Sequence, residues 1–381
     1  MIRAKLKGRA DLDKNDKQIS GAHNENAHKS KKKLLWTFVF IAIAGLTVWA
    51  ITAQNKNFSF KEFSAFIMKA NPFWVAMAFL GMLGFIVFEG MALLCICKAF
   101  GYRRGVSKGY IYSASDIYFS AITPSASGGQ PASAYFMVKD GIPGSLVTVA
   151  LLINLVMYTF AILTLGIIAF LVRPLAFLQF APLSKILIIA GVLTLSVLAA
   201  VFILVLKKHT LLHSVCDRFL SLLAKLKIVR RLEKKRKKLA NWVESYRECA
   251  AAIGGKTSML VKAFIFNFLQ RLSLTLVTVF SFLAGGGAPS ETVDVLMRQI
   301  MVVLGSNCVP IPGAMGVADY LMLDAFSQII DDASAVVNLE LLSRTVSFYF
   351  CVLLCGASLI VRIISDKIKA KRNKDLLNVE I

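Results

Sequence analysis

The chain has 381 residues, of which 57% are hydrophobic and 17% are charged, and its formal net charge at pH 7 is +22. Soluble domains carry a larger share of charged residues, so this composition excludes an ordinary soluble protein. The positive charges gather in short segments beside long apolar stretches, a pattern that indicates membrane topology and argues against a nucleic-acid partner.

The N-terminal 33 residues are polar and contain ten Lys and Arg residues, so residues 1–33 are predicted to be a basic cytoplasmic tail. The apolar stretch that follows, Leu34–Ala53, is too long for the core of a signal peptide and lacks a small-residue cleavage site. We therefore expect it to remain as a membrane span. Next along the chain, Phe58–Ala70 has apolar residues at helical spacing and is predicted to lie on the outer membrane surface.

Six segments reach the roughly 20 apolar residues that a helix needs to cross about 30 Å of hydrocarbon. They are Leu34–Ala53, Phe73–Cys97, Leu146–Val172, Leu183–Leu206, Ser258–Ala284, which also carries polar residues, and Ala335–Ile364. The predicted fold is an all-α polytopic membrane protein with about six full spans. Its transmembrane domain covers residues 34–367, and residues 368–381 form a second cytoplasmic tail.

The loops between these spans differ in charge, and loops rich in Lys and Arg remain in the cytoplasm. Lys98–Lys108, the long loop over residues 207–257 and Lys367–Lys374 all carry such an excess. Gly285–Asp294 and Asp324–Asp332 are acidic or nearly neutral and are assigned to the outside. This assignment predicts a multi-pass protein of the cell membrane with both termini in the cytoplasm.

Within the long basic loop, Arg230–Trp242 is basic and amphipathic. It can bind anionic lipid headgroups, at roughly 1 kcal/mol per well-placed cation, or it can be a topology signal in a solvated helix. The sequence leaves both interpretations open.

Two further apolar segments lie between the spans and are broken in their middle. Tyr110–Pro143 starts and ends in the cytoplasm, and its first part, up to Ile122, would be about 20 Å long as a helix, too short to cross. It is predicted to be a re-entrant helical hairpin. A second hairpin, broken by VPIPGAMG at 309–316, starts and ends outside. The units 73–172 and 258–364 are therefore predicted to be inverted repeats, an architecture found in transporters.

Each break would expose backbone groups at mid-membrane, which implies a shared polar cavity, and the half-helix after each break would present an N-terminus that favours an anion. The first turns of these half-helices are expected to hold Pro131 and Pro312. Residues expected to bind substrate, through close backbone approach with φ > 0 or through side-chain donors, are Gly128, Gly129, Gly313, Gly316, Ser125, Ser127 and Gln130. Taken singly, each break is equally well explained as a kink or packing point.

Charged side chains within the spans point to the same cavity. An unpaired charge is costly there, so Arg271, beside Gln270, is predicted to hold a phosphate bidentately, with Glu89 as a plausible partner. Glu340 and Arg344 are spaced to form a local salt bridge near the outer interface. Each hairpin also carries an aspartate, Asp116 and Asp319, which can couple transport to an ion or act as a cap; the sequence leaves that choice open.

The seven Cys and four His residues show no spacing typical of metal ligands, and no phosphate-binding Walker loop is present. We predict no metal, no cofactor and no catalytic residue. The cysteines are interpreted as small apolar side chains in a reducing compartment.

The motifs TPSASGGQPA at 123–132 and VPIPGAMGVAD at 309–319 resemble those of the lysylphosphatidylglycerol synthase transmembrane region family, the flippase-like domain of the multiple peptide resistance factors. The resemblance covers about Leu34–Lys367, and Asp319 stands where the family form has Glu. Full-length members add a cytoplasmic domain that transfers lysine from tRNA to phosphatidylglycerol. This chain ends soon after its last span, so the resemblance implies the stand-alone translocase branch.

The first hypothesis is therefore a lipid translocase that acts on phospholipids such as phosphatidylglycerol or its lysyl ester. The second is a phosphatidylglycerol lysyltransferase-family protein in aminoacyl-lipid synthesis, although no nucleophile and base pair supports that chemistry. The third is a secondary transporter of a small anion or a polyprenyl phosphate. Expected partners are phospholipids, with anionic headgroups at the basic loop and no nucleic acid, and homo-oligomer formation is left open.

Overall fold

The computed structural model describes residues 60–123, 127–207, 251, 253–307 and 316–377. The basic tail, the first predicted span and most of the long basic loop lie outside these residues. The described residues fall, apart from Phe60, in one compact unit over Lys61–Ile381. Their regular structure is helical throughout, with no strand among them.

Five helical segments are long and apolar enough to cross a membrane. They are α3 (Pro72–Ala99), α6 (Gly144–Val172), α8 (Pro182–Lys207), α11 (Thr257–Ala284) and a continuous run of α14 (Ala333–Arg344), the π-helix η4 (Thr345–Phe350) and α15 (Cys351–Leu377). They coincide with five of the six predicted spans and confirm an all-α polytopic membrane protein. The π-helical turn inside the last span was not predicted.

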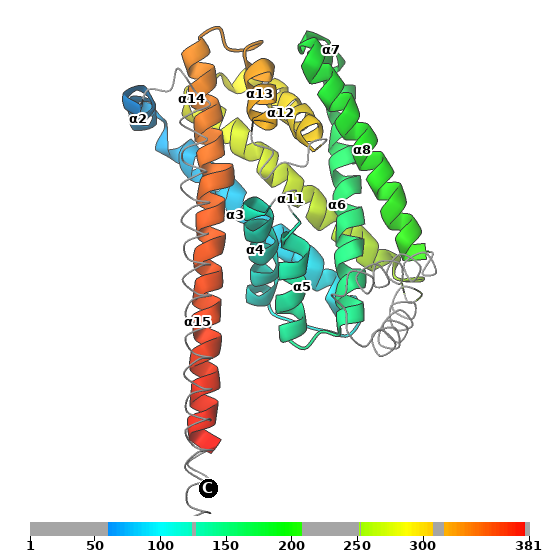
Figure 1. Cartoon of the computed structure of the whole chain (residues 1–381). Helices are drawn as coiled ribbons and strands as arrows, with labels where there is room; N and C mark the ends of the chain where they lie inside the picture. Colours follow the sequence, from blue (N-terminus) through cyan, green and yellow to red (C-terminus); the bar gives the residue numbers. More distant parts are fainter. Residues whose placement is uncertain (1–59, 124–126, 208–250, 252, 308–315, 378–381) are drawn as a thin grey trace, which may run out of the picture. The chain divides into compact units, whose positions relative to one another are not determined.

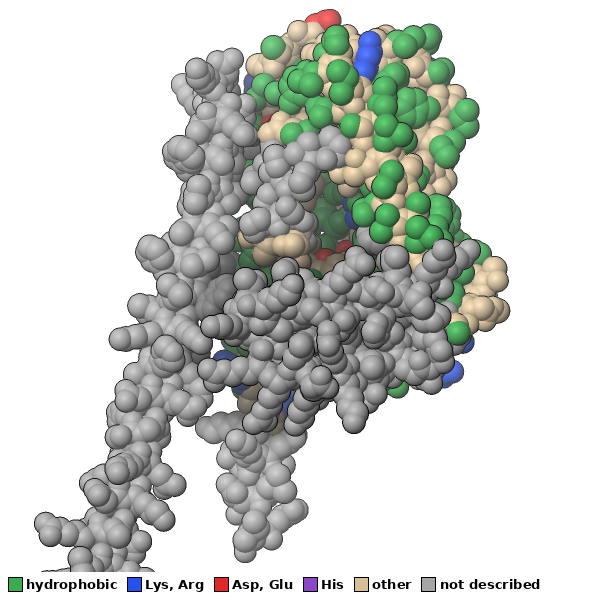
Figure 2. Space-filling view, turned by 45° about the vertical axis from the view of Figure 1, so that its right-hand side comes forward, with side chains coloured by type: hydrophobic (Ala, Val, Ile, Leu, Met, Phe, Trp, Pro, Cys, Tyr) green, Lys and Arg blue, Asp and Glu red, His purple; other side chains and the backbone are tan. Residues whose placement is uncertain are grey.

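The lipid-facing character of these helices is visible on α8. Its large apolar side chains point away from the bundle over several turns, among them Leu183, Ile186, Ile189, Leu193 and Val197. Figure 2 shows hydrophobic side chains spread over this part of the surface. Such a surface would be costly in water, and it fits contact with hydrocarbon.

The centre of the unit is an antiparallel pair formed by α3 and α11 (Figure 1). At one end of the pair, the backbone N–H of Asn71 donates to the carbonyl oxygen of Ala284 over 2.9 Å. At the other end, Lys256 Nζ donates to the carbonyl oxygen of Ala99, also over 2.9 Å. Each helix therefore begins where the other ends.

Two short hairpins follow the members of this pair. α4 (Val106–Ile122) and α5 (Gly129–Lys139) follow α3, whereas η2 (Pro289–Glu291), α12 (Thr292–Ser306) and α13 (Val317–Phe326) follow α11. The longest of the four α-helices, α4, has 17 residues and is about 25 Å long, so none crosses the hydrocarbon alone. Since α3 and α11 are antiparallel, the hairpins enter from opposite ends of the pair, as Figure 1 shows. The breaks fall where the sequence predicts them, but a repeat relationship between the two units stays a prediction.

Two smaller helices complete the unit. α2 (Phe60–Lys69) coincides with the predicted surface helix, and its side chain Phe66 packs close to Gly285 just after α11. α7 (Pro174–Gln179) joins α6 to α8 and was not predicted.

Candidate functional site

A cavity of about 630 Å³ lies where both hairpins meet the long helices. Its volume is in the range of pockets that take small molecules or lipid headgroups. Its polar lining consists of Glu89, Asp116, Ser120, Gln130, Asn154, Tyr158, Asn267, Gln270, Arg271, Thr278, Gln299, Ser306, Asn307, Ser343, Arg344 and Ser347. Figure 2 shows a hollow with acidic and basic atoms in its depth, between surfaces covered by apolar side chains.

Two buried carboxyl groups lie side by side on one wall of this cavity. Glu89 comes from α3 and Asp116 from α4, and the two groups are close enough to influence each other electrostatically. Glu89 Oε2 accepts from Ser113 Oγ over 3.1 Å and from Gln270 Nε2 over 3.0 Å. The predicted residues Glu89, Asp116 and Gln270 therefore lie together on the cavity wall.

Asp116 lies against the start of α5. A Cβ added at Gly129 would collide with the carboxylate and carbonyl oxygens of Asp116, and Gln130 Nε2 donates to Asp116 Oδ2 over 2.7 Å. The positive end of α5 thus faces a carboxylate of the chain itself. The sequence predicts that Gly128 and Gly129 allow φ > 0 and close approach of a ligand; in the structure Gly128 has φ −82°, and neither is among the glycines with positive φ. Gly129 is required because α4 approaches so closely.

Arg271 occupies a different position on the cavity wall. Its guanidinium carbon lies 4.0 Å from the ring centre of Tyr158 and 5.1 Å from that of Phe85. Among the described residues the guanidinium donates no hydrogen bond, its buried Nε has no partner, and no carboxylate oxygen lies within 4.0 Å of its nitrogens. The predicted ion pair with Glu89 is therefore absent from the described contacts, although the two charges are close enough to influence each other.

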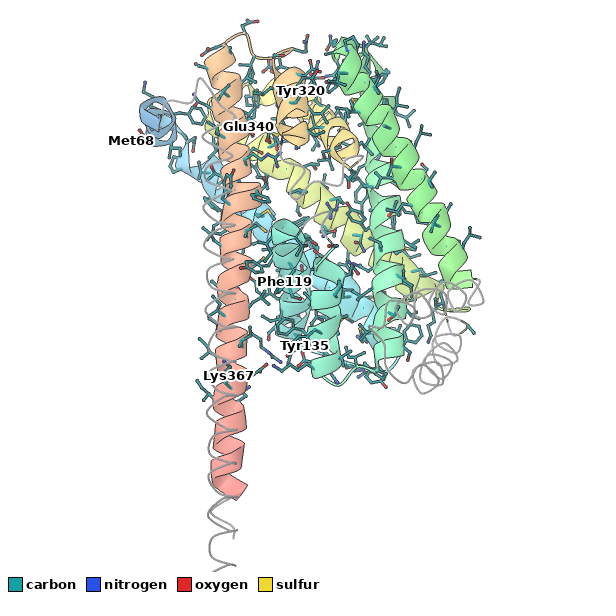
Figure 3. The ribbon with its side chains drawn as sticks, viewed as in Figure 1. Met68, Phe119, Tyr135, Tyr320, Glu340 and Lys367 are labelled. Atoms are coloured by element: carbon teal, nitrogen blue, oxygen red, sulfur yellow. The ribbon has the colours of Figure 1, made fainter. Side chains whose placement is uncertain are left out.

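The second hairpin has its own charged cluster. Asp319 Oδ2 accepts from the backbone N–H of Gly316 over 2.8 Å and so caps α13, while Asp319 Oδ1 forms an ion pair with Arg344. The predicted pair of Glu340 and Arg344 is present, with 3.7 Å between Oε1 and Nε. Glu340 is buried and Arg344 is partly buried, and Figure 3 shows Glu340 on the side of α14 that faces α13. The cap interpretation of Asp319 is thus confirmed, as is φ > 0 at Gly316, which is +79°.

The other predicted site residues divide into two groups. Ser125, Pro312 and Gly313 lie outside the described residues. Ser127, Gly128, Gly129 and Gly316 are described but are not among the residues that line the cavity. Pro131 lies in the first turn of α5, as predicted.

Several amide and hydroxyl residues of the site were missed by the sequence analysis. Asn154 Oδ1 accepts from Asn267 Nδ2 over 2.9 Å, and the hydroxyl of Tyr158 donates to Asn307 Oδ1 over 3.2 Å. The available signal was an amide inside an otherwise apolar span, as at Asn154 in α6. Three amide oxygens on the cavity wall have no partner among the described residues: those of Asn267, Gln270 and Gln299. Buried polar atoms left open in this way are suited to accept from a bound molecule.

The open end of the first hairpin is fixed by Asp140, just after α5. Its carboxylate accepts from the Tyr112 hydroxyl over 2.9 Å and from Arg362 Nη2 over 2.7 Å, and it forms an ion pair with Lys108. Burial alone would raise the pKa of Asp140, but the bonds from Lys108 and Tyr112 and the charge of Arg362 lower it below its ordinary value. This network ties the first hairpin to α15.

One family model, described as the lysylphosphatidylglycerol synthase TM region, matches residues 35–355. The matched region contains both hairpins and every residue that lines the cavity. No curated protein matches the chain.

Proposed function

The chain belongs to the lysylphosphatidylglycerol synthase TM region family, and from this membership and the form of the cavity we propose that it is a lipid translocase. In this proposal a phospholipid headgroup enters the cavity while its acyl tails remain in the hydrocarbon. The substrate is a phospholipid with one negative phosphate, such as phosphatidylglycerol or its lysyl ester. Both termini face the cytoplasm, as the loop charges predict.

The observation that carries the proposal is the state of Arg271. Its guanidinium is held in place by aromatic faces on two sides, an arrangement that stabilises a cation without neutralising it. Among the described residues no carboxylate pairs with it and its Nε has no hydrogen-bond partner, and Arg271 lines the cavity. A guanidinium with free parallel donors matches the oxygens of a phosphate.

The unpartnered amide oxygens add a second kind of recognition. Gln270 is the neighbour of Arg271 in sequence, and its Oε1 is buried without a partner among the described residues. Asn267 Oδ1 and Gln299 Oε1 are in the same state. Acceptors of this type suit the hydroxyl or ammonium donors that follow the phosphate in a phospholipid headgroup. In this proposal Arg271 binds the phosphate of the headgroup, and the amide oxygens bind its hydroxyl or ammonium groups.

The half-helix N-termini contribute less than the sequence predicts. In the first hairpin the start of α5 faces Asp116, and in the second the N–H of Gly316 at the start of α13 is bonded to Asp319. Each positive helix end already faces a carboxylate of the chain. We therefore assign the anion to Arg271 rather than to the helix ends. The hairpins themselves supply the walls that open toward opposite sides of the bilayer.

Leaflet exchange in proteoliposomes tests this function. The full chain is reconstituted with fluorescent phosphatidylglycerol, and a membrane-impermeant quencher reports the fraction of lipid in each leaflet over time. We expect exchange well above that of empty liposomes. Arg271→Gln should lower the rate at least tenfold, because a charge-assisted hydrogen bond contributes about 1.5 to 3 kcal/mol.

The matched control is Arg103→Gln, an exposed arginine on the loop between α3 and α4, which should keep the rate of the original chain. The same assay with lysyl-phosphatidylglycerol and with phosphatidylcholine ranks the headgroups. Exchange no faster than in empty liposomes, or equal rates for Arg271→Gln and the original chain, would refute the proposal.

A further inference from the structure

The carboxyl groups of Glu89 and Asp116 form an unusual pair inside the cavity. Both residues are less than a tenth exposed, at 7% and 8%, and both line the cavity. The two carboxyl groups are close enough to influence each other electrostatically. Two negative charges side by side in a buried site repel each other, and one proton held by the pair relieves that repulsion. A pair of this kind is most stable with one proton and one negative charge.

The surroundings of the pair stabilise that single negative charge. Ser113 and Gln270 donate to Glu89, and Ser120 and Gln130 donate to Asp116. The start of α5 adds its positive end beside Asp116, close to Gly129. These are neutral donors, so the charge of the pair is not cancelled by a direct ionic contact among the described residues.

Other titratable groups face the pair from the helices packed around it. Arg271 of α11 acts on both carboxyl groups, and Cys351 at the start of α15 faces Glu89. Arg344 lines the same cavity but already has the carboxylates of Asp319 and Glu340. The net charge around Glu89 and Asp116 therefore depends on Arg271 and on any anion bound to Arg271.

Charge balance then links the pair to a ligand. With one proton shared, the pair carries −1 and Arg271 carries +1, so this wall of the cavity is neutral. A phosphate diester bound to Arg271 would leave a net charge of −1 in a region of low dielectric, which is costly. A second proton on the pair restores neutrality. Proton and anion therefore favour each other, and the linkage is reciprocal.

We propose that Glu89 and Asp116 form a proton-binding site, and that one proton enters the cavity together with each anionic headgroup. The inference rests on the proposed binding of an anion at Arg271, and it adds the ion that drives transport. The proton comes from water in the cavity and is released there when the headgroup leaves. A membrane with an acidic side should therefore drive the lipid away from that side.

The first test imposes a pH difference on the leaflet-exchange assay. We expect movement of labelled phosphatidylglycerol away from the acidic side to be several-fold faster than at equal pH on both sides, and movement toward it to be slower. In the double variant Glu89→Gln/Asp116→Asn, which leaves no carboxyl group at this site to take up the proton, this ratio should fall to one, whatever its absolute rate. Asp331→Asn, an exposed carboxylate in the loop before α14, is the control and should keep the ratio.

The second test does not need transport. Short-chain phosphatidylglycerol is added to the purified full chain in detergent with weak buffer, and a pH indicator measures proton uptake. We expect uptake of up to one proton for each lipid bound, and none in the double variant Glu89→Gln/Asp116→Asn. If exchange fails but uptake occurs, the translocase proposal is wrong and the proton site stands. Absence of lipid-dependent uptake, or a pH response unchanged in the double variant, would overturn the inference.

Discussion

A cluster of the same three residue types lies beside each hairpin, but the side chains are connected differently in the two clusters. Each cluster has an aspartate from a hairpin, a glutamate from a long helix and an arginine. In the second cluster, Asp319, Glu340 and Arg344, the arginine is paired with both carboxylates. In the first cluster, Glu89, Asp116 and Arg271, the carboxyl groups accept from neutral amide donors and the arginine stacks on aromatic rings.

This difference separates a structural role from a binding role. Arg344 balances the charge of Asp319, which caps α13, and of Glu340, so it serves the fold. Arg271 has no carboxylate partner among the described residues, and the nearby carboxyl groups accept hydrogen bonds from neutral donors. Residue types alone would have treated the two arginines alike. Their partners show which of them can bind a ligand.

The largest expected effect on stability comes from replacing the arginine of each cluster. Arg344→Gln removes the cation from a partly buried group of carboxylates and should lower the free energy of unfolding by about 3 kcal/mol. Arg271→Gln removes a cation that is bound mainly by aromatic faces, and should cost about 1 kcal/mol or less. Thermal unfolding of both variants in the same detergent checks this contrast. Equal losses would mean that the two clusters are not different in kind.

The next effect concerns the close contact that holds Asp116 in the first cluster. Gly129→Ala would place a methyl group against the Asp116 carboxylate and its carbonyl oxygen, so we expect a loss of about 1 to 3 kcal/mol in stability. The first turn of α6 offers a matched control, because a Cβ at Gly144 would meet nothing within 4 Å. Gly144→Ala should leave the unfolding midpoint unchanged or raise it slightly. A Gly129→Ala protein as stable as Gly144→Ala would contradict the described packing.

Gly316 is the corresponding glycine of the second cluster. Glycine is required there by the backbone conformation and not by close packing. Its φ of +79° is strained for any residue with a side chain, so Gly316→Ala should cost about 1 to 2 kcal/mol. Asp319→Asn at the same cap separates the backbone strain from the loss of the carboxylate. If Gly316→Ala unfolds at the temperature of the original chain, the left-handed cap is not formed in the protein.

Much of the fold follows from the sequence because the membrane allows few solutions. Spans such as α3 and α11 were predicted to within two residues at each end, since apolar length and the thickness of hydrocarbon decide them. The end of α4 at Ile122 was predicted from the Thr-Pro that follows. The hairpins were predicted because each segment had to start and end on the same side.

The pairing inside the site could not be predicted in the same way. Whether an arginine forms an ion pair with a carboxylate depends on how α4, α11 and α14 pack against each other. Residue spacing within a single helix does not predict this packing. The close contact between Gly129 and α4 was not predicted, since a glycine that adopts φ > 0 and one that allows close packing are alike in sequence. The π-helix η4 after Arg344 also lacks a sequence signal, although such turns are frequent at functional sites.

The smallest effect is expected at the open end of the first hairpin, outside the cavity, and it depends on pH. The pKa of Asp140 is lowered in the folded protein, so its bonds to Tyr112 and Arg362 contribute fully above the pKa of an unfolded aspartate, about 3.9. That contribution is lost as the pH falls through the lower folded value. Asp140→Asn should therefore unfold at a lower temperature than the original chain at pH 7, and the difference should shrink toward pH 3. A difference that is constant over this range would show that the carboxylate charge does not hold the hairpin to α15.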